Sequence, residues 1–265
     1  MINLLSYFFI YVFIGWCVEV IFAALKNGEV VNRGFLNGPI CPIYGVGAVS
    51  VIHILEPYSE NGLILFIGAV VITSVVELVT GFLLEKLFHQ RWWDYSKEPL
   101  NIGGYICLRF SLMWGLACLI VVGYVHPLII RFVNFIPNTL SYILLITFSA
   151  LLITDLIFTV MTILKLNKKL SKIEEVSLKI REVSDELSMQ IGTRTISLVD
   201  KNIDKNNKMI KKLESKRDAL LESGFFGQKR MINAYPKMKS TKYNKALQKL
   251  KAYIRKNKDK DKEQK

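Results

Sequence analysis

Long apolar runs dominate the first 164 residues of this 265-residue chain, and short polar connections separate them. Runs of about 18 or more mostly apolar residues are typical of membrane-spanning helices. Five segments fit this pattern, the second being the shortest: 2–25, 40–55, 63–88, 105–132 and 140–164. The pattern therefore predicts an all-α integral membrane protein with about five transmembrane helices, in a transmembrane domain of residues 1–164.

From residue 165 onwards the apolar residues become sparser and follow a heptad-like spacing. One seam, with alternating steps of three and four residues, comprises Ile173, Val176, Ile180, Val183 and Leu187. A second seam, in a different phase after Gly192, comprises Ile196, Val199, Ile203, Asn206, Ile210, Leu213 and Leu220. Because such seams are typical of coiled coils, residues 165–224 are predicted to form two helices that pair with each other or with another chain.

The last segment, 225–265, is predicted to combine a short basic amphipathic helix with a disordered end. Tyr243, Leu247, Leu250 and Ile254 form an apolar stripe, whereas the residues after Ile254 are too highly charged to fold. The basic helix is interpreted either as a surface that binds anionic lipid head groups or as an ordinary solvated face.

Charge is distributed unevenly along the chain, whose formal net charge is +13. Residues 1–164 contain 7 Lys or Arg and 9 Asp or Glu, whereas residues 165–265 contain 28 and 13. Since basic segments stay on the cytoplasmic side, the C-terminus is predicted to be cytoplasmic and, with five spans, the N-terminus to lie outside the plasma membrane. Binding to nucleic acid is not expected, because a cytoplasmic position already accounts for the positive charge.

The apolar domain shows signs of a duplication. Glu19 is followed fourteen residues later by Arg33, and Glu77 is followed fourteen residues later by Arg91. A G-x-I-C sequence comes next in both places. Spans one and two, and spans three and four, are therefore predicted to form a parallel two-helix repeat, the alternative being a chance similarity of two hydrophobic hairpins.

Three carboxylates lie inside the predicted spans: Glu19, Glu77 and Asp155. A carboxylate is costly in the bilayer, so it normally faces protein or water and marks a site. One interpretation is a polar pathway or relay for a proton or cation; the other is a structural ion pair or a protonated carboxyl that fixes helix register. Candidate charge partners are Arg33, Arg91 and Arg109.

Two connections, 32–47 and 91–115, are rich in glycine, proline and polar residues that break helices. Backbone of this kind is tolerated at membrane depth only where it is buried in protein or lines water. Both connections are therefore predicted to be re-entrant, the alternative being interfacial turns within an aromatic belt. The polar groups would come from Asn32, Arg33, Asn37 and Asn101, and the glycines of the lining are Gly34, Gly38, Gly103 and Gly104. An aromatic belt does not explain Asp94, which is counted with the pathway residues.

Motifs of well-known chemistry are missing from the sequence. It contains no Walker A sequence, no H-E-x-x-H and no G-x-S-x-G, so no cofactor is expected and enzymatic activity stays an open question. The four cysteines have no metal-ligand spacing and are interpreted as small packing residues, so no metal site is predicted either.

The polar positions of the apolar domain resemble those of a known family. They are Gly15-Trp16, Glu19, NRGFLNGPICPIYGVG from Asn32, Glu77, Thr80-Gly81, WWDYS, NIGGYICL and Trp114-Gly115. These sequences are similar to the CmpB-like proteins, a bacterial family of ABC-transporter permeases of type IV, over about residues 8–125. The resemblance implies a multi-pass plasma-membrane protein with a role in transport, and a separate ATPase subunit, since this chain has no ATPase sequence.

Three functions fit these observations. The first is a permease in the lipid bilayer that moves a small solute or ion, with a separate ATPase subunit as its partner. Glu19 and Glu77 would be the charge-carrying groups, and Arg33 and Arg91 their partners or clamps for an anion. The second is a membrane scaffold or sensor whose tail forms homo-oligomers or recruits other proteins. The third is a membrane enzyme acting on lipid or cell-wall precursors, with Asp94 as its carboxylate.

Overall fold

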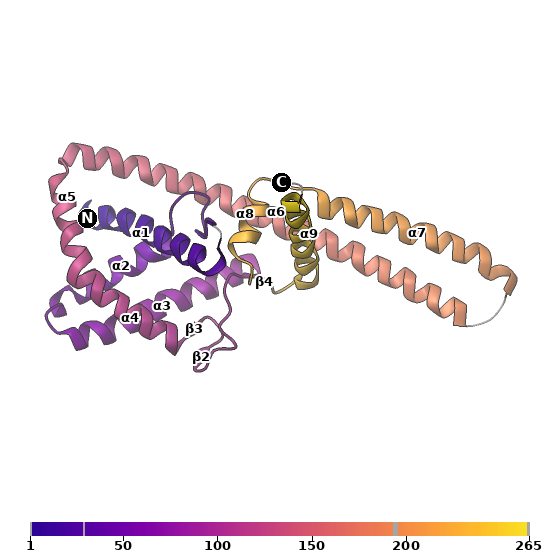
Figure 1. Cartoon of the computed structure of the whole chain (residues 1–265), viewed down its shortest axis with the longest axis horizontal. Helices are drawn as coiled ribbons and strands as arrows, with labels where there is room; N and C mark the ends of the chain where they lie inside the picture. Colours follow the sequence, from indigo (N-terminus) through magenta and orange to yellow (C-terminus); the bar gives the residue numbers. More distant parts are fainter. Residues whose placement is uncertain (1, 29, 193–195, 264–265) are drawn as a thin grey trace. The chain divides into compact units, whose positions relative to one another are not determined.

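The computed structural model describes residues 2–28, 30–192 and 196–263, and most of them form helices (Figure 1). The chain divides into two compact units. The first contains Met1–Met161 together with Arg230–Lys239, and the second contains Thr162–Lys229 and Ser240–Lys265. The division near residue 161 lies close to the predicted boundary at residue 164. The return of Arg230–Lys239 to the first unit has no counterpart in the predicted division at residues 224 and 225.

The first unit contains four stretches that are long and apolar enough to cross a membrane, counted over the described residues. These are Ile2–Leu25, Gly62–Phe88, Leu108–Phe135 and the apolar part of Asn138–Met189. The helices involved are α1 (Ile2–Asn27), α3 (Gly62–Phe88), α4 (Leu108–Ile120), α5 (His126–Phe135) and α6 (Asn138–Gly192), with a π-helical segment, Val121–Val125, joining α4 to α5.

The segment predicted as the second span forms a shorter helix, α2 (Pro42–Leu55), of 14 residues. At 1.5 Å per residue it is about 21 Å long, which is less than the roughly 30 Å of a bilayer core. Pro42 occupies the first turn, where a missing amide hydrogen costs nothing. A short 3-10 turn, Glu56–Tyr58, then leads to α3, whose N-cap is Asn61.

The connection before α2 runs back along α1. The Cys41 amide donates to the Val12 carbonyl at 3.0 Å, and α2 then packs against the N-terminal half of α1. The contact is close at Gly45, where an added Cβ would lie 2.5 Å from Val12 Cγ2. Val12 lies fifteen residues before the end of α1, so the connection returns by about 22 Å before α2 begins.

The connection between α3 and α4 follows a similar course. It contains three short strands, β1 (Gln90–Arg91), β2 (Asn101–Ile102) and β3 (Ile106–Cys107), and β2 pairs with β3 in antiparallel register. Ser111 in α4 lies beside Ser74 in α3, with their hydroxyls 2.8 Å apart. Helix α4 therefore starts near the level of Glu77, about 16 Å before the end of α3. Cys41 and Cys107, which end the two G-x-I-C sequences, are the N-cap residues of α2 and α4.

The second unit contains the remainder of α6, α7 (Ile196–Glu222) and α9 (Asn244–Glu263); α8 (Gln228–Ala234) and β4 (Lys239–Ser240) lie at the unit boundaries. Within this unit α7 runs back alongside α6 (Figure 1). The seam positions of both helices are less exposed than their neighbours where side chains are described, which fits a hairpin. The side chains of Ile196, Val199 and Ile203 lie outside the described residues, as does Thr193, and a coiled coil stays a prediction.

The C-terminal helix differs from the predicted disorder. Helix α9 continues to Glu263, beyond the apolar stripe that ends at Ile254. Leu247 and Leu250 from this stripe are buried, and Lys249 donates to the Ser177 hydroxyl of α6 at 3.0 Å. Packing of the stripe holds the first part of α9, and the helix continues from it into the charged segment for which composition alone indicated an unfolded end.

Candidate functional site

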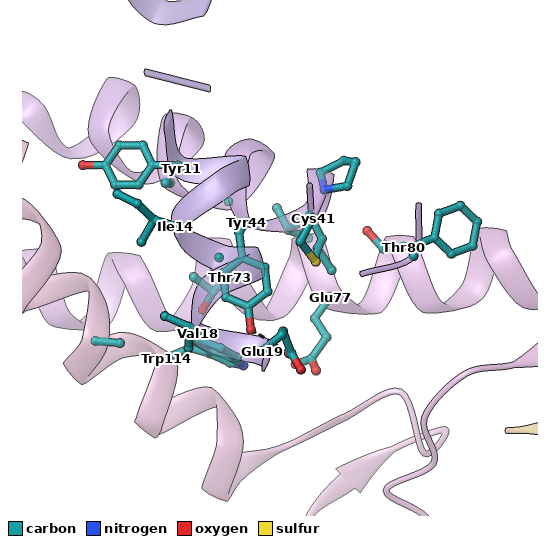
Figure 2. A pocket seen from close by; sticks show the side chains of 18 of the residues that line it. Tyr11, Ile14, Val18, Glu19, Cys41, Tyr44, Thr73, Glu77, Thr80 and Trp114 are labelled. Atoms are coloured by element: carbon teal, nitrogen blue, oxygen red, sulfur yellow. Dashed lines mark hydrogen bonds between the residues drawn. The ribbon is translucent and has the colours of Figure 1, made fainter. Parts of the chain in front are cut away.

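A cavity of about 440 Å³ lies inside the first unit (Figure 2). Residues of α1, α2, α3 and α4 line it, together with residues of the two returning connections and Tyr235. Its lining is mostly apolar and aromatic, and it includes three charged side chains: Glu19, Arg33 and Glu77. A mostly apolar cavity with a few converging polar groups is the usual form of a small-molecule site.

Glu19 of α1 is held by two partners. Arg33 Nη1 lies 3.5 Å from Glu19 Oε2, and the Tyr44 hydroxyl donates to Glu19 Oε1 at 2.8 Å. The backward course of the first connection brings Arg33 alongside Glu19. Tyr44 of α2 reaches the same carboxylate because it packs directly over Gly15, where an added Cβ would lie 2.2 Å from the tyrosine ring.

Glu77 of α3 has a less complete set of partners. The Tyr95 hydroxyl donates to Glu77 Oε1 at 3.2 Å. The other carboxylate oxygen, Oε2, is buried and has no hydrogen-bond partner among the described residues. Figure 2 shows Glu19 and Glu77 reaching toward the same part of the cavity from different helices. Burial, together with the nearby charges of Glu77 and Glu19, raises the pKa of Tyr95, so this tyrosine is a neutral hydrogen-bond donor.

Aromatic side chains form much of the wall. The Trp114 ring lies edge-on to Tyr44, with centroids 5.4 Å apart, and Trp93 Nε1 donates to the Tyr105 carbonyl at 2.8 Å. Trp92 packs edge-on against Phe35, and its buried Nε1 has no hydrogen-bond partner among the described residues. The interior thus presents ring faces and edges around two carboxylates.

Asp155 of α6 binds the backbone of the first connection. Its carboxylate accepts from the Asn37 amide at 3.0 Å, from Asn37 Nδ2 at 2.8 Å and from the Gly38 amide at 2.6 Å. Asn32 orders the same connection, because its Oδ1 accepts from Trp16 Nε1 at 2.9 Å and its Nδ2 donates to the Asn37 carbonyl at 2.7 Å. These bonds satisfy backbone groups that hydrocarbon could not.

The second connection is held by its own ion pairs. Arg91 pairs with Glu85, at 2.7 Å, and with Asp94, at 3.6 Å, and does not pair with Glu77. Asn101 Oδ1 accepts from the Gly104 amide at 3.1 Å. Gly104 has φ +73°, and an added Cβ would lie 2.5 Å from the Ser96 hydroxyl, so no other residue fits this turn.

The segment Arg230–Lys239 is bonded to both connections. The Arg230 guanidinium donates to Asn37 Oδ1 at 3.1 Å and to the Gly34 carbonyl at 3.0 Å. The Tyr235 hydroxyl donates to the Arg33 carbonyl at 2.8 Å, and Tyr235 also lines the cavity. At the end of the segment, Lys239 pairs with Asp94 of the second connection at 2.5 Å.

Of the predicted site residues, the structure brings Glu19, Arg33 and Glu77 together around the cavity. The others lie elsewhere. The first connection contains or is held by Asn32, Gly34, Gly38 and Asp155. The second connection contains Arg91, Asp94, Asn101, Gly103 and Gly104, and Arg109 is exposed beside Phe110. Sequence reasoning missed Tyr44, Tyr95, Trp114 and Tyr235 as lining residues. Tyr44 and Tyr95 lie within the sequences of the family resemblance, which is a signal that could have found them.

The fold and the site define a helical membrane protein with a small-molecule-sized cavity among its transmembrane helices. Residues 6–160 match the family described as "Putative ABC-transporter type IV", and this match covers more than half of the chain. The chain therefore belongs to this family. Comparison with curated proteins and with solved structures found no match.

The Asp94–Lys239 pair predicts a pH dependence. The hydrogen bond from Lys239, helped by that from Ser96, holds the pKa of Asp94 well below its ordinary value of 3.8. A lowered pKa in the folded state stabilises the fold above the ordinary pKa; this contribution starts to decline as the pH falls below about 4 and is lost fully only when the pH falls through the lowered pKa. We expect Asp94→Asn to destabilise the protein at pH 7, and the difference from wild type in a denaturant titration to shrink by pH 3. An equal difference at both pH values would contradict this role for the ion pair.

Proposed function

We propose that this chain is the membrane-embedded permease component of a transporter, and that a small solute or ion passes through the cavity. The observation that carries the proposal is the cavity itself, with the carboxylates of Glu19 and Glu77 converging in it between the two helix pairs. Membership in an ABC-transporter family favours a separate ATPase as the source of energy. Self-association through α6 and α7 is a further part of the proposal.

The course of the chain supports five membrane crossings. Helix α2 brings the chain back to the level where α1 began, because Ile52 packs in the same cluster as Tyr7. Leu55, at the end of α2, contacts Gly68 near the start of α3. Helices α1 and α3 therefore run in the same direction, which requires a crossing between them. We assign this crossing to the first returning connection and α2 together, with the N-terminus outside and the C-terminus in the cytoplasm.

A discontinuous second crossing suits a permease. Its irregular half ends at Cys41 beside the cavity, and the N-terminus of α2 begins there. In many transporters, broken helices place backbone groups and helix ends at a solute site near the middle of the membrane. The repeated order of a long helix, a returning connection and a helix capped by cysteine also supports the predicted parallel repeat, although Arg33 and Arg91 have different partners.

A cysteine placed in the cavity tests whether water and solutes reach it. Gly47 lines the cavity, and an added Cβ would meet nothing within 4 Å, so Gly47→Cys should fold normally. In a variant whose four natural cysteines are replaced by alanine, we expect this thiol to react with a small membrane-impermeant thiol reagent. The rate should change when the ATPase partner and ATP are present.

The matched control is Gly62→Cys, where an added Cβ also has open space. Gly62 follows the connection that we place outside, so its thiol should react in right-side-out vesicles and be protected in inverted ones. No reaction of Gly47→Cys from either side, while Gly62→Cys reacts, would favour a dry scaffold over a permease. Reaction of Gly62→Cys in inverted vesicles alone would reverse the proposed orientation.

A further inference from the structure

We infer that the ligand of this cavity is an organic cation: an ammonium group that faces Glu77, carried on an apolar body that packs against the aromatic wall. This inference rests on the proposed function only in assigning the ligand to the same cavity, because binding can be measured without transport. Three features of the lining carry it: the sum of its charges, the unsatisfied oxygen of Glu77 and the density of aromatic rings.

The charges of the lining leave one carboxylate without a counter-ion. Arg33 is paired with Glu19, which also accepts from Tyr44. Glu77 has no cationic partner among the described residues, and Arg91, which follows it at the same spacing as Arg33 follows Glu19, is paired with Glu85 and Asp94. The lining therefore has a formal charge of −1, and a ligand with a single positive charge would neutralise it.

The geometry of Glu77 shows where the positive charge would bind. The Tyr95 hydroxyl donates to one carboxylate oxygen, Oε1. The other oxygen, Oε2, is buried and has no hydrogen-bond partner among the described residues. Buried polar atoms are nearly always hydrogen-bonded, so an unsatisfied one on a residue that lines a cavity indicates a group that arrives with the ligand. Because Oε2 has almost no accessible surface, the Glu77 side chain has to turn toward the cavity for the ligand to reach this atom. An ammonium N–H is the donor that suits a carboxylate oxygen best, because the bond is then charge-assisted on both sides.

The aromatic wall favours a cation with an apolar body over a bare metal ion. Trp114 and Tyr44 lie beside the carboxylates, and Trp92, Trp93 and Tyr95 come from the second connection. Tryptophan and tyrosine faces attract ammonium groups and pack well against alkyl or aromatic chains. A hard metal ion would need several oxygen ligands, and no group of three metal-binding side chains occurs among the described residues. A volume of about 440 Å³ suits an organic molecule.

Binding of three probes that share a phenethyl body but differ in charge tests the inference on the purified full-length chain. The probes are phenethylammonium, the neutral 2-phenylethanol and the anionic 3-phenylpropionate, and the readouts are isothermal titration calorimetry and the quenching of tryptophan fluorescence. We expect phenethylammonium to bind at least about tenfold more tightly than the alcohol, since a hydrogen bond between charged groups contributes on the order of a tenfold change or more. The anion should bind more weakly than both.

Matched variants locate the charge that is recognised. Glu77→Gln should lower the affinity for phenethylammonium about tenfold and leave the affinity for 2-phenylethanol unchanged. Glu85→Gln, two helical turns away on α3, removes a carboxylate that does not line the cavity and should leave both affinities unchanged. Trp114→Leu should weaken binding of the cation about fivefold through the loss of the ring face.

Each remaining outcome has a definite meaning. Equal affinities for cation and alcohol, preference for the anion, or no binding of any probe by a correctly folded protein would overturn the inference. Normal cation binding with an unreactive Gly47→Cys would instead contradict the permease and leave the cation site standing. A reactive Gly47→Cys without cation preference would leave the permease and remove the proposed ligand class.

Discussion

Asp155→Leu should release the first connection from α6 and lower the free energy of unfolding of the first unit by roughly 3–5 kcal/mol. The Asp155 carboxylate accepts from the amides of Asn37 and Gly38 and from Asn37 Nδ2. Leucine is close in size but accepts nothing, and each buried donor left without a partner costs about 1–3 kcal/mol. Because water cannot replace the lost acceptor within the bilayer, we expect an effect near the upper end of single substitutions.

The measurement is an SDS-induced unfolding titration of the purified protein, with hydrogen exchange of residues 32–41 as a local readout. Thr154→Val is the matched control: it makes the neighbouring position of the same helix apolar, but Thr154 is exposed and its hydroxyl bonds only to the Ala150 carbonyl within α6. Asp155→Asn, which keeps one acceptor oxygen, should fall between the two. If Asp155→Leu behaved like Thr154→Val, the carboxylate would have no anchoring role, and a place in an ion pathway would become the better explanation for it.

The long spans could be predicted because their signal is local. Twenty or more apolar residues in a row can satisfy their backbone in lipid only as a helix, so the bounds of α1 and α3 follow from hydropathy. The second span was harder, because its first half is irregular backbone. The sequence 32–47 was predicted to break the helix; residues 32–41 are non-helical, whereas residues 42–47 form the first turns of α2. Hydropathy also does not show that the chain runs back beside α1 before α2 begins.

The site could be predicted only where its partners lie close in the sequence or on the same repeat. The fourteen-residue spacing of Glu19 and Arg33 corresponds to an ion pair because the connection returns along α1. The same spacing does not pair Glu77 with Arg91, because α3 continues to Phe88, eleven residues beyond Glu77, whereas α1 ends at Asn27, eight residues beyond Glu19. Arg91 therefore stays near the end of α3 and pairs with Glu85. Equal spacing in the sequence did not produce equal ion pairs, because the two helices end at different distances from the glutamates.

Contacts over long sequence distances had no signal in the pattern. Arg230 and Tyr235 bind the first connection from about two hundred residues away. The basic composition of the tail suggested lipid head groups as partners, since a positive charge on a cytoplasmic segment is ordinary. The acceptors of Arg230 are instead backbone carbonyls and an asparagine oxygen, groups that carry no charge and that a charge pattern cannot reveal.

Arg230→Met should detach the segment Arg230–Lys239 from the first connection. The guanidinium donates to the Gly34 carbonyl and to Asn37 Oδ1. Burial lowers the pKa of Arg230, and the nearby charges of Tyr235 and Asp155 partly offset this shift. Buried hydrogen bonds from a charged donor are worth about 1.5–3 kcal/mol each; because these bonds are only partly buried, losing the set should weaken docking by roughly 2–4 kcal/mol in total. Hydrogen exchange of residues 230–239 should then accelerate by about 30-fold or more, at a free-energy cost of about 1.4 kcal/mol per factor of ten.

Lys229→Met is the control for charge and side-chain length, because Lys229 is the exposed neighbour in α8. It should leave the exchange rates at their wild-type values. Tyr235→Phe removes a single hydroxyl that donates to the Arg33 carbonyl, so it should show a smaller acceleration than Arg230→Met.

Since Tyr235 also lines the cavity, a detached segment should open the cavity to reagents, and Gly47→Cys should react faster in the Arg230→Met background. Faster exchange without faster thiol reaction would limit the segment to a structural role at the connection, whereas unchanged exchange would show that Arg230 does not hold the segment in place.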